Sequence, residues 1–140
     1  MPVTKKHEAI LEFLGKVAED SADPLLTARL AAAIVYKGDI VSIGVNKMKS
    51  HPFQMRYAKM PKSIFLHAET DAIKNALKRI DQDTLSRSTL YISRIRYYDN
   101  TKQLVTYGLA KPCIGCQRAI ATFNIKNVCY SLNDEGFEFL

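Results

Sequence analysis

Two short stretches decide how this chain can fold and act: His67-Ala68-Glu69, and further along Pro112-Cys113-Ile114-Gly115-Cys116. They bring one imidazole, two thiols and one carboxylate. Imidazole and thiolate groups are ordinary zinc ligands, and three protein ligands leave the fourth tetrahedral position open to water, as in catalytic zinc sites. These residue types therefore predict a catalytic zinc ion held by His67, Cys113 and Cys116.

Glu69 has a separate predicted role. A carboxylate that is not itself a ligand can carry the protons that the attack of water requires. Each residue alone has a more ordinary explanation, such as a structural histidine, an acid near a helix N-terminus, or a redox or structural cysteine pair. Their joint occurrence favours the catalytic interpretation. The third cysteine, Cys129, lies in an apolar segment, and we expect it to pack as a core residue.

The composition is that of an ordinary globular protein. The chain has 140 residues, of which 47% are hydrophobic and 24% charged, enough for one core and one predicted domain over residues 1–140. Its longest apolar stretch, residues 30–36, is too short to span a bilayer, so no membrane partner is expected. Without an export signal or a disulfide pattern, a reducing, cytoplasmic compartment is expected.

Positive charge is concentrated in one segment. The net charge is +6, and no Asp or Glu occurs between Asn46 and Leu66. This acid-free segment predicts an anionic partner nearby, although a solvated basic loop would look the same. Its basic residues are Lys47, Lys49, His51, Arg56, Lys59 and Lys62.

Hydrophobic periodicity and turn residues predict an α/β fold with helices packed on a sheet. The expected elements are a helix from Thr4 to about residue 20, a hairpin of strands 30–36 and 40–45 turning at Gly38, a helix over 68–80, a strand over 89–97, a turn at Asp99-Asn100, a returning strand over 103–107, a helix from 112 or 113 and a strand over 127–131. Residues 46–66 are expected to be a loop with room for one helical turn, and no assignment is made for 132–140. Both ligand groups fall at helix N-termini, where the helix dipole favours thiolate.

The paired motifs are the signature of zinc-dependent nucleobase deaminases. Over about residues 29–131 the chain resembles the cytidine deaminase-like superfamily, particularly its deoxycytidylate deaminase and tRNA-adenosine-deaminase-like branches. The resemblance implies a three-layer α/β/α sandwich with a mixed central sheet, His67, Cys113 and Cys116 as zinc ligands, and Glu69 as the proton shuttle. It also implies that Asn46, at the end of a strand, faces the substrate sugar; the alternative is a strand-ending turn residue.

The chain departs from the family pattern in two places. Many relatives have a glutamate before the proline of the cysteine motif, where this chain has Lys111. The path from residue 97 to Pro112 is longer than in compact members and predicts an extra hairpin. Residues 44–52 are weakly similar to small phage-encoded deaminase-like proteins, which would place the protein in the host cytoplasm. Relatives are usually oligomers, so a homo-oligomer is expected.

The expected activity is hydrolytic deamination of a cytosine nucleotide, dCMP to dUMP, with release of ammonia. Lys49, His51 and Arg56 are the candidates for binding a 5′-phosphate. An adenine-type or polynucleotide deaminase is the alternative, with nucleic acid as the second-choice partner and Phe53, Tyr57 and Phe65 either stacking on bases or packing the loop onto the core. A non-catalytic, zinc-stabilised binding module is a third possibility, against which Glu69 argues.

Overall fold

The computed structural model describes residues 2–21, 29–47, 51–57, 66–97 and 105–140. The expected turn at Asp99-Asn100 and the candidates Lys49 and Phe65 lie outside these ranges. In the described part of the chain, no helix is both long enough and apolar enough to cross a membrane.

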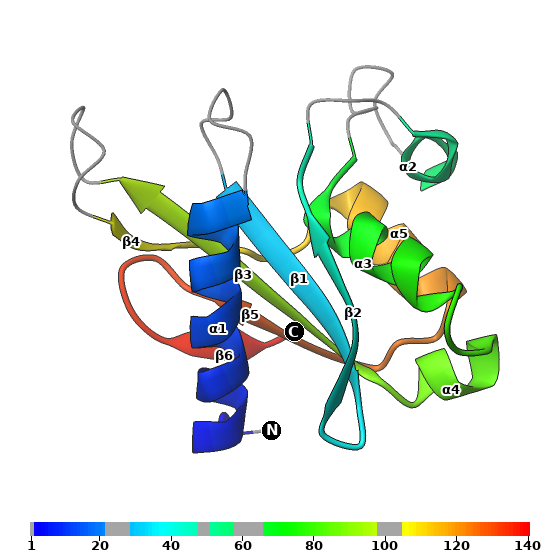
Figure 1. Ribbon diagram of the computed structural model, residues 1–140, viewed down its shortest axis with the longest axis horizontal. Helices are drawn as coiled ribbons and strands as arrows, with labels where there is room; N and C mark the ends of the chain where they lie inside the picture. Colours follow the sequence, from blue (N-terminus) through cyan, green and yellow to red (C-terminus); the bar gives the residue numbers. More distant parts are fainter. Residues whose placement is uncertain (1, 22–28, 48–50, 58–65, 98–104) are drawn as a thin grey trace.

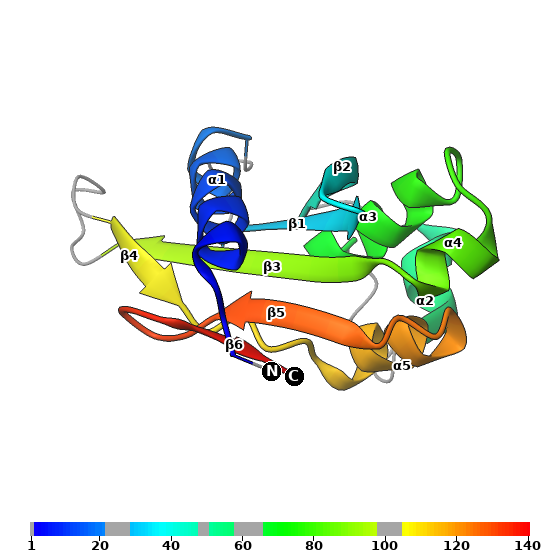
Figure 2. The same ribbon diagram turned by 90° about the horizontal axis from the view of Figure 1, so that it is seen from below.

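A six-stranded mixed sheet forms the centre of the described structure (Figure 1). Its strands are β1 (Arg29–Tyr36), β2 (Asp39–Val45), β3 (Thr89–Tyr97), β4 (Val105–Gly108), β5 (Asn127–Ser131) and β6 (Phe137–Phe139). The order is β2-β1-β3-β5-β6, and β4 pairs with β3 beyond the point where β5 leaves it. The parallel pair β3 and β5 runs side by side in Figure 2, and the other pairings are antiparallel.

Helices cover both faces of the sheet, which confirms the three-layer α/β/α arrangement. One face packs against α1 (Lys5–Ser21), on the left in Figure 1. The other face packs against α3 (Ala68–Ala76) and α5 (Ile114–Thr122), with the short helices α2 (Pro52–Tyr57) and α4 (Gln82–Ser86) beside them.

Alternation along the central strands creates the two core layers. In β1, Ala31 and Ala33 face α1, whereas Ala32 and Ile34 face α3, and all four are fully buried. A strand that is buried on both faces has a continuous apolar sequence, as residues 30–36 have. The small alanine side chains let helices approach the sheet closely on both sides.

Close packing also explains a glycine in β2. A Cβ on Gly44 would lie 2.5 Å from the carbonyl oxygen of Ala68 and nearer still to the backbone nitrogen of Ala72. Only glycine lets α3 lie directly on the strand at this point. The first turn of α3 is thereby held against the end of β2.

Two elements and one boundary differ from the sequence-based expectation. The helix expected over 68–80 ends at Ala76, because the N–H groups of Lys78 and Arg79 bond three residues back and form a turn. Asp81 then starts α4, its carboxylate accepting a hydrogen bond from the N–H of Thr84 at 2.8 Å. The unassigned tail contributes β6. The hairpin is confirmed, with positive φ at both Lys37 and Gly38, as a type I′ turn requires.

Candidate active site

The three expected metal ligands lie at the N-termini of two neighbouring helices. His67 is the N-cap residue of α3, Cys113 is the N-cap residue of α5, and Cys116 lies in the first turn of α5. The His67 side chain makes no capping hydrogen bond to α3. The His67 Nδ1 atom is instead 3.2 Å from the Cys116 Sγ atom and 3.6 Å from the Cys113 Sγ atom.

This geometry fits zinc. All three ligand atoms lie within 4.8 Å of one another. With usual Zn–N and Zn–S bond lengths, a nitrogen and a sulfur on one tetrahedron are about 3.6 Å apart, close to the distances seen here. One imidazole nitrogen and two thiolates could hold the ion and leave one position open.

The thiols share a strongly polarised environment. Hydrogen bonds from Cys116 and His67 lower the pKa of Cys113 to about 3. The pKa of Cys116 is raised, because its proton is held by Cys113 and its side chain is buried. The lowered pKa favours the thiolate form of Cys113, and a bound zinc ion would favour deprotonation of both sulfurs.

Glu69 lies on the first turn of α3, next to the ligand cluster. Its side chain is only 4% exposed. Burial raises the pKa of its carboxyl group above the usual value. A buried carboxyl beside a metal site is well placed to accept and return a proton.

A pocket of about 280 Å³ opens beside this cluster. Larger surface hollows, of about 500 and 580 Å³, lie away from the cluster, one along β2 and the end of α3 and one around Arg87 and Lys126. Only the pocket beside the cluster joins possible metal ligands to a buried acid among these hollows. It is lined by Leu30, Asn46, His67, Ala68, Glu69, Arg94, Leu109, Ala110, Lys111 and Cys113.

Residues 4–132 match the family model described as "Cytidine and deoxycytidylate deaminase zinc-binding region". The chain belongs to this family. Zinc is therefore the metal expected at the cluster, and the donor set fits it. No curated protein matches the chain significantly.

Solved structures of deaminases share the fold. The dCMP deaminase from the cyanophage S-TIM5 in apo form is 20% identical with a TM-score of 0.61, covering 94% of this chain and 86% of that one. The same enzyme in complex with dCMP and dUMP is 19% identical with a TM-score of 0.62, covering 94% and 85%. Cytidine deaminase from Burkholderia pseudomallei is 16% identical with a TM-score of 0.62, covering 96% and 91%.

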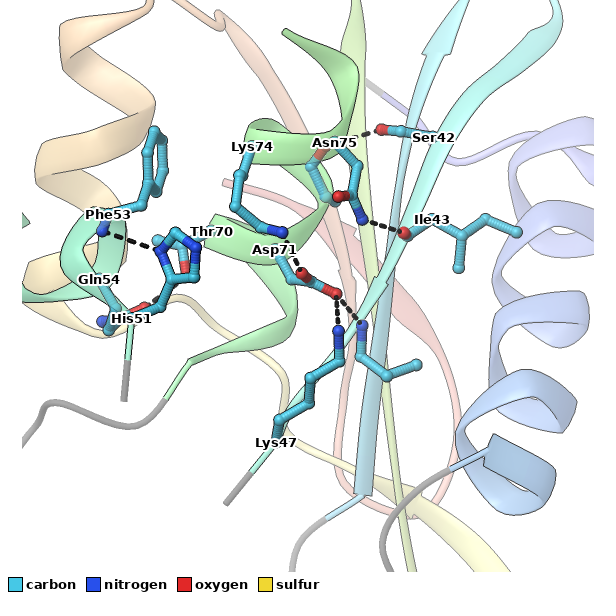
Figure 3. A network of polar contacts seen from close by, with 12 residues as sticks. Ser42, Ile43, Lys47, His51, Phe53, Gln54, Thr70, Asp71, Lys74 and Asn75 are labelled. Carbon is cyan, nitrogen blue, oxygen red and sulfur yellow. Dashed lines mark hydrogen bonds and ion pairs between the residues drawn. The ribbon is translucent and has the colours of Figure 1, made fainter. Parts of the chain in front are cut away.

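In this family member, α2 supports the histidine ligand. Gln54 is 1% exposed, and its Oε1 accepts a hydrogen bond from the backbone N–H of His67 at 3.2 Å. The hydroxyl of Thr70 bonds to the same oxygen (Figure 3). The bond fixes the residue at which α3 begins. Gln54 has no sequence signal of its own, since it lies in a segment expected to be mostly loop.

The structure places the four expected substrate residues differently. Asn46 lines the pocket, and its Oδ1 accepts a hydrogen bond from the N–H of Leu30 at 2.9 Å. His51 and Arg56 do not line the pocket. The Nδ1 atom of His51 accepts a hydrogen bond from the N–H of Phe53 at 3.0 Å, at the start of α2. Arg56 is exposed on the same helix. Lys49 is outside the described residues.

The pocket instead contains two other cations, Arg94 and Lys111. Lys111 stands out in the sequence only as a departure from the family pattern. Arg94 carries no sequence signal, because an arginine within a strand is equally typical of a solvated sheet edge. Its place in the pocket depends on strand pairing, which the sequence does not encode locally.

The described aromatic residues of α2 pack into the core, which confirms the packing interpretation over base stacking. Tyr57 is buried, and its ring lies 5.4 Å from Phe53 and 6.5 Å from Phe123, centroid to centroid. Phe53 also stacks on Phe123 at 6.1 Å. These rings attach α2 to α5 and are engaged within the fold.

Proposed function

We propose that this family member is a zinc-dependent hydrolytic deaminase of a cytosine nucleotide, converting dCMP to dUMP and releasing ammonia. The observation that carries the proposal is the convergence of His67, Cys113 and Cys116 with the buried acid Glu69 at one pocket. The fold shared with a phage dCMP deaminase that was solved in complex with dCMP and dUMP supports the choice of substrate.

His67, Cys113 and Cys116 would hold the zinc ion. When bound, zinc supplies a Lewis acid that lowers the pKa of a water molecule and so makes a nucleophile available near neutral pH. Glu69 accepts the proton of that water as its oxygen adds to C4 of the ring, and delivers it to N3. The proton of the hydroxyl group added to C4 then passes through Glu69 to the exocyclic amine. The C4–N4 bond breaks, ammonia departs, and a carbonyl remains at C4.

Asn46 orients the substrate in this proposal. The bond from the Leu30 N–H to its Oδ1 holds the amide in one orientation beside the pocket. A fixed amide can discriminate between hydroxyl positions, and we assign it to the sugar. Leu30 and Leu109 supply apolar surface on the same walls.

The alternatives have less support. A polynucleotide deaminase would gain from exposed stacking rings, but the rings of Phe53 and Tyr57 are packed in the core. A non-catalytic zinc module has no need of a buried acid beside the metal. A phosphate role for Lys49, His51 and Arg56, a single domain, a homo-oligomer and a cytoplasmic location stay predictions from the sequence.

Ammonia release by the zinc-loaded protein tests the proposal. The panel is dCMP, CMP, deoxycytidine, cytidine, dAMP, AMP and single-stranded DNA and RNA, with Glu69→Ala as the blank. Turnover of dCMP well above the adenine nucleotides supports the proposal. Turnover on polynucleotide alone, with a steep loss on raising the salt concentration, would contradict it, because many counterions are released only from a polyanion.

A further inference from the structure

A row of four residues crosses the sheet at the pocket. Asn46 follows β2 and bonds to Leu30 on β1, Leu30 is paired with Arg94 on β3, and Arg94 is paired with Gly108 on β4. Neighbouring strands lie about 4.8 Å apart, so the backbones of Asn46 and Arg94 are about 10 Å from each other. Asn46, Leu30 and Arg94 all line the pocket.

Arg94 has no carboxylate partner in the described part of the chain, unlike its neighbour. Arg96, two residues along the same strand and therefore on the same face, donates to Asp134 at 2.7 Å. For Arg94 no ion pair is found among the described residues. The Nε atoms of Arg94 and Arg96 are both buried without a hydrogen bond, so the ion pair is what distinguishes the two arginines. A partly buried guanidinium without a counter-charge is costly, which indicates that an anion completes the site.

Gly108 makes room for the side chain of Arg94. A Cβ at this position would lie 3.0 Å from Cδ, 3.1 Å from Cγ and 3.2 Å from Nε of Arg94. The φ angle of Gly108 is not positive, so backbone conformation does not require glycine here. The Arg94 side chain therefore passes directly over Gly108, and a Cβ at this position would push it aside.

The backbone under Arg94 is held firmly. Ser131 Oγ accepts a hydrogen bond from the N–H of Arg94 at 3.0 Å and donates one to the carbonyl oxygen of Gly108 at 2.7 Å. Ser131 is fully buried at the point where β4 and β5 meet the same edge of β3. The guanidinium thus projects from a rigid element rather than from a loop, as a specific binding group should.

We propose that Arg94, with Lys111 beside it in the pocket, binds the phosphate of the substrate, so that the pocket selects a nucleoside monophosphate over the nucleoside. The inference rests on the proposed function for the cytosine end of the ligand. Guanidinium groups bind phosphate through two parallel hydrogen bonds, a geometry that lysine cannot reproduce. In this pocket Glu69 is the one acid among the described lining residues, and the proposed proton transfer occupies it.

Calorimetric binding of the product tests the inference without depending on turnover. The titrants are dUMP and deoxyuridine, and the proteins are zinc-loaded wild type, Arg94→Gln, Arg94→Lys and Gly108→Ala. The matched control is Arg96→Gln, which removes the same charge from the same face of the same strand. Arg94→Gln should weaken dUMP binding roughly 10- to 100-fold and leave deoxyuridine unchanged. The dUMP affinities of Arg94→Lys and Gly108→Ala should lie between those of wild type and Arg94→Gln. The dUMP affinity of Arg96→Gln should match that of wild type.

The outcomes separate this inference from the proposed function. Selective loss of dUMP binding in Arg94→Gln supports the inference even if the wild type releases no ammonia, a result that would overturn only the deaminase proposal. Equal affinities of wild type for dUMP and deoxyuridine, or equal losses in Arg94→Gln and Arg96→Gln, would overturn the inference. Tighter, Arg94-dependent binding of a short single-stranded oligonucleotide than of dUMP would also overturn it, by assigning the phosphate to a polynucleotide.

Discussion

The carboxylate of Asp71 on α3 accepts a hydrogen bond from the backbone N–H of Val45, the last residue of β2, at 3.1 Å. The same oxygen lies 3.3 Å from the Nζ atom of Lys47. One carboxylate therefore contacts the residue before Asn46 and the residue after it. Because α3 also carries Glu69 and has His67 as its N-cap residue, a single helix positions a metal ligand, the proposed proton carrier and the proposed sugar contact.

Replacing Asp71 should therefore weaken both the fold and substrate binding. The side chain is 2% exposed and also pairs with Lys74 at 3.4 Å. Asp71→Ala leaves the N–H of Val45 without its acceptor, and we expect a loss of about 1–3 kcal/mol in the free energy of unfolding. Urea denaturation measures it, and the KM for dCMP should rise while zinc content stays unchanged.

The control for Asp71 is Asp83. Its ion pair with Arg87 at 2.9 Å is largely exposed, with 80% of the Asp83 side chain accessible. Exposed pairs of this kind contribute little, so Asp83→Ala should change the urea midpoint only slightly. Equal destabilisation by the two substitutions would show that the contacts of Asp71 have no special role.

Gly44→Ala should disrupt the contact between β2 and α3. Its Cβ would meet helix backbone, which cannot move aside as a flexible side chain can. We expect a loss of about 3 kcal/mol or more, at the upper end of overpacking costs. Ser42→Ala, two residues away on the same strand, removes only the bond to the carbonyl of Ala72 and should cost about 1 kcal/mol. Similar thermal stability of the two variants would refute the close approach.

Gln54→Leu should weaken zinc binding without touching a ligand. The substitution removes the acceptor of the His67 N–H, which helps fix where α3 begins. Changes in the residues that support metal ligands typically lower metal affinity 10- to 100-fold, and a loss of roughly that size is expected in competition with a chelator. Met55→Leu, on the exposed side of the same helix, is the control and should bind zinc as wild type does.

The three cysteines should differ in reactivity once zinc is removed from the folded protein. The pKa of Cys113, lowered to about 3 by its hydrogen bonds with Cys116 and His67, makes it a thiolate at pH 6. Burial raises the pKa of Cys129 to about 11, so this residue stays a protected thiol at the same pH. Iodoacetamide followed by mass spectrometry should find Cys113 modified first, and zinc should suppress that reaction. Equal labelling of Cys129 and Cys113 would contradict the assignment.

Much of the fold follows from local sequence patterns. The apolar run at 30–36, the turn at Gly38 and the β-branched residues at 89–97 predict strands that the structure contains. The β6 strand was not predictable in this way, because three residues of strand carry too little pattern. The α4 helix was not predicted from the sequence, because a helix of only five residues carries too little periodicity, although Asp81 caps its start.

The zinc ligands of the site were more predictable from the sequence than the cations that line its pocket. The ligand motif is local in sequence, so His67, Cys113 and Cys116 could be chosen before the structure was known, and they lie together. The cations of the pocket could not be predicted from the sequence, because Arg94 is brought to the pocket only by the pairing of β3 with β1 and β4. Charge density in the sequence instead pointed to the segment around Arg56, which lies on α2 outside the pocket lining.

The most direct test of the central claim compares zinc-loaded wild type with Glu69→Gln. Zinc content is measured by atomic spectrometry and conversion of dCMP to dUMP by the change in ultraviolet absorbance. We predict one zinc per chain in both proteins, turnover by wild type, and a rate roughly 10²- to 10⁴-fold lower in Glu69→Gln, because a positioned proton carrier contributes that much. Equal rates in the two proteins, or zinc-loaded wild type that leaves dCMP unchanged, would contradict the account.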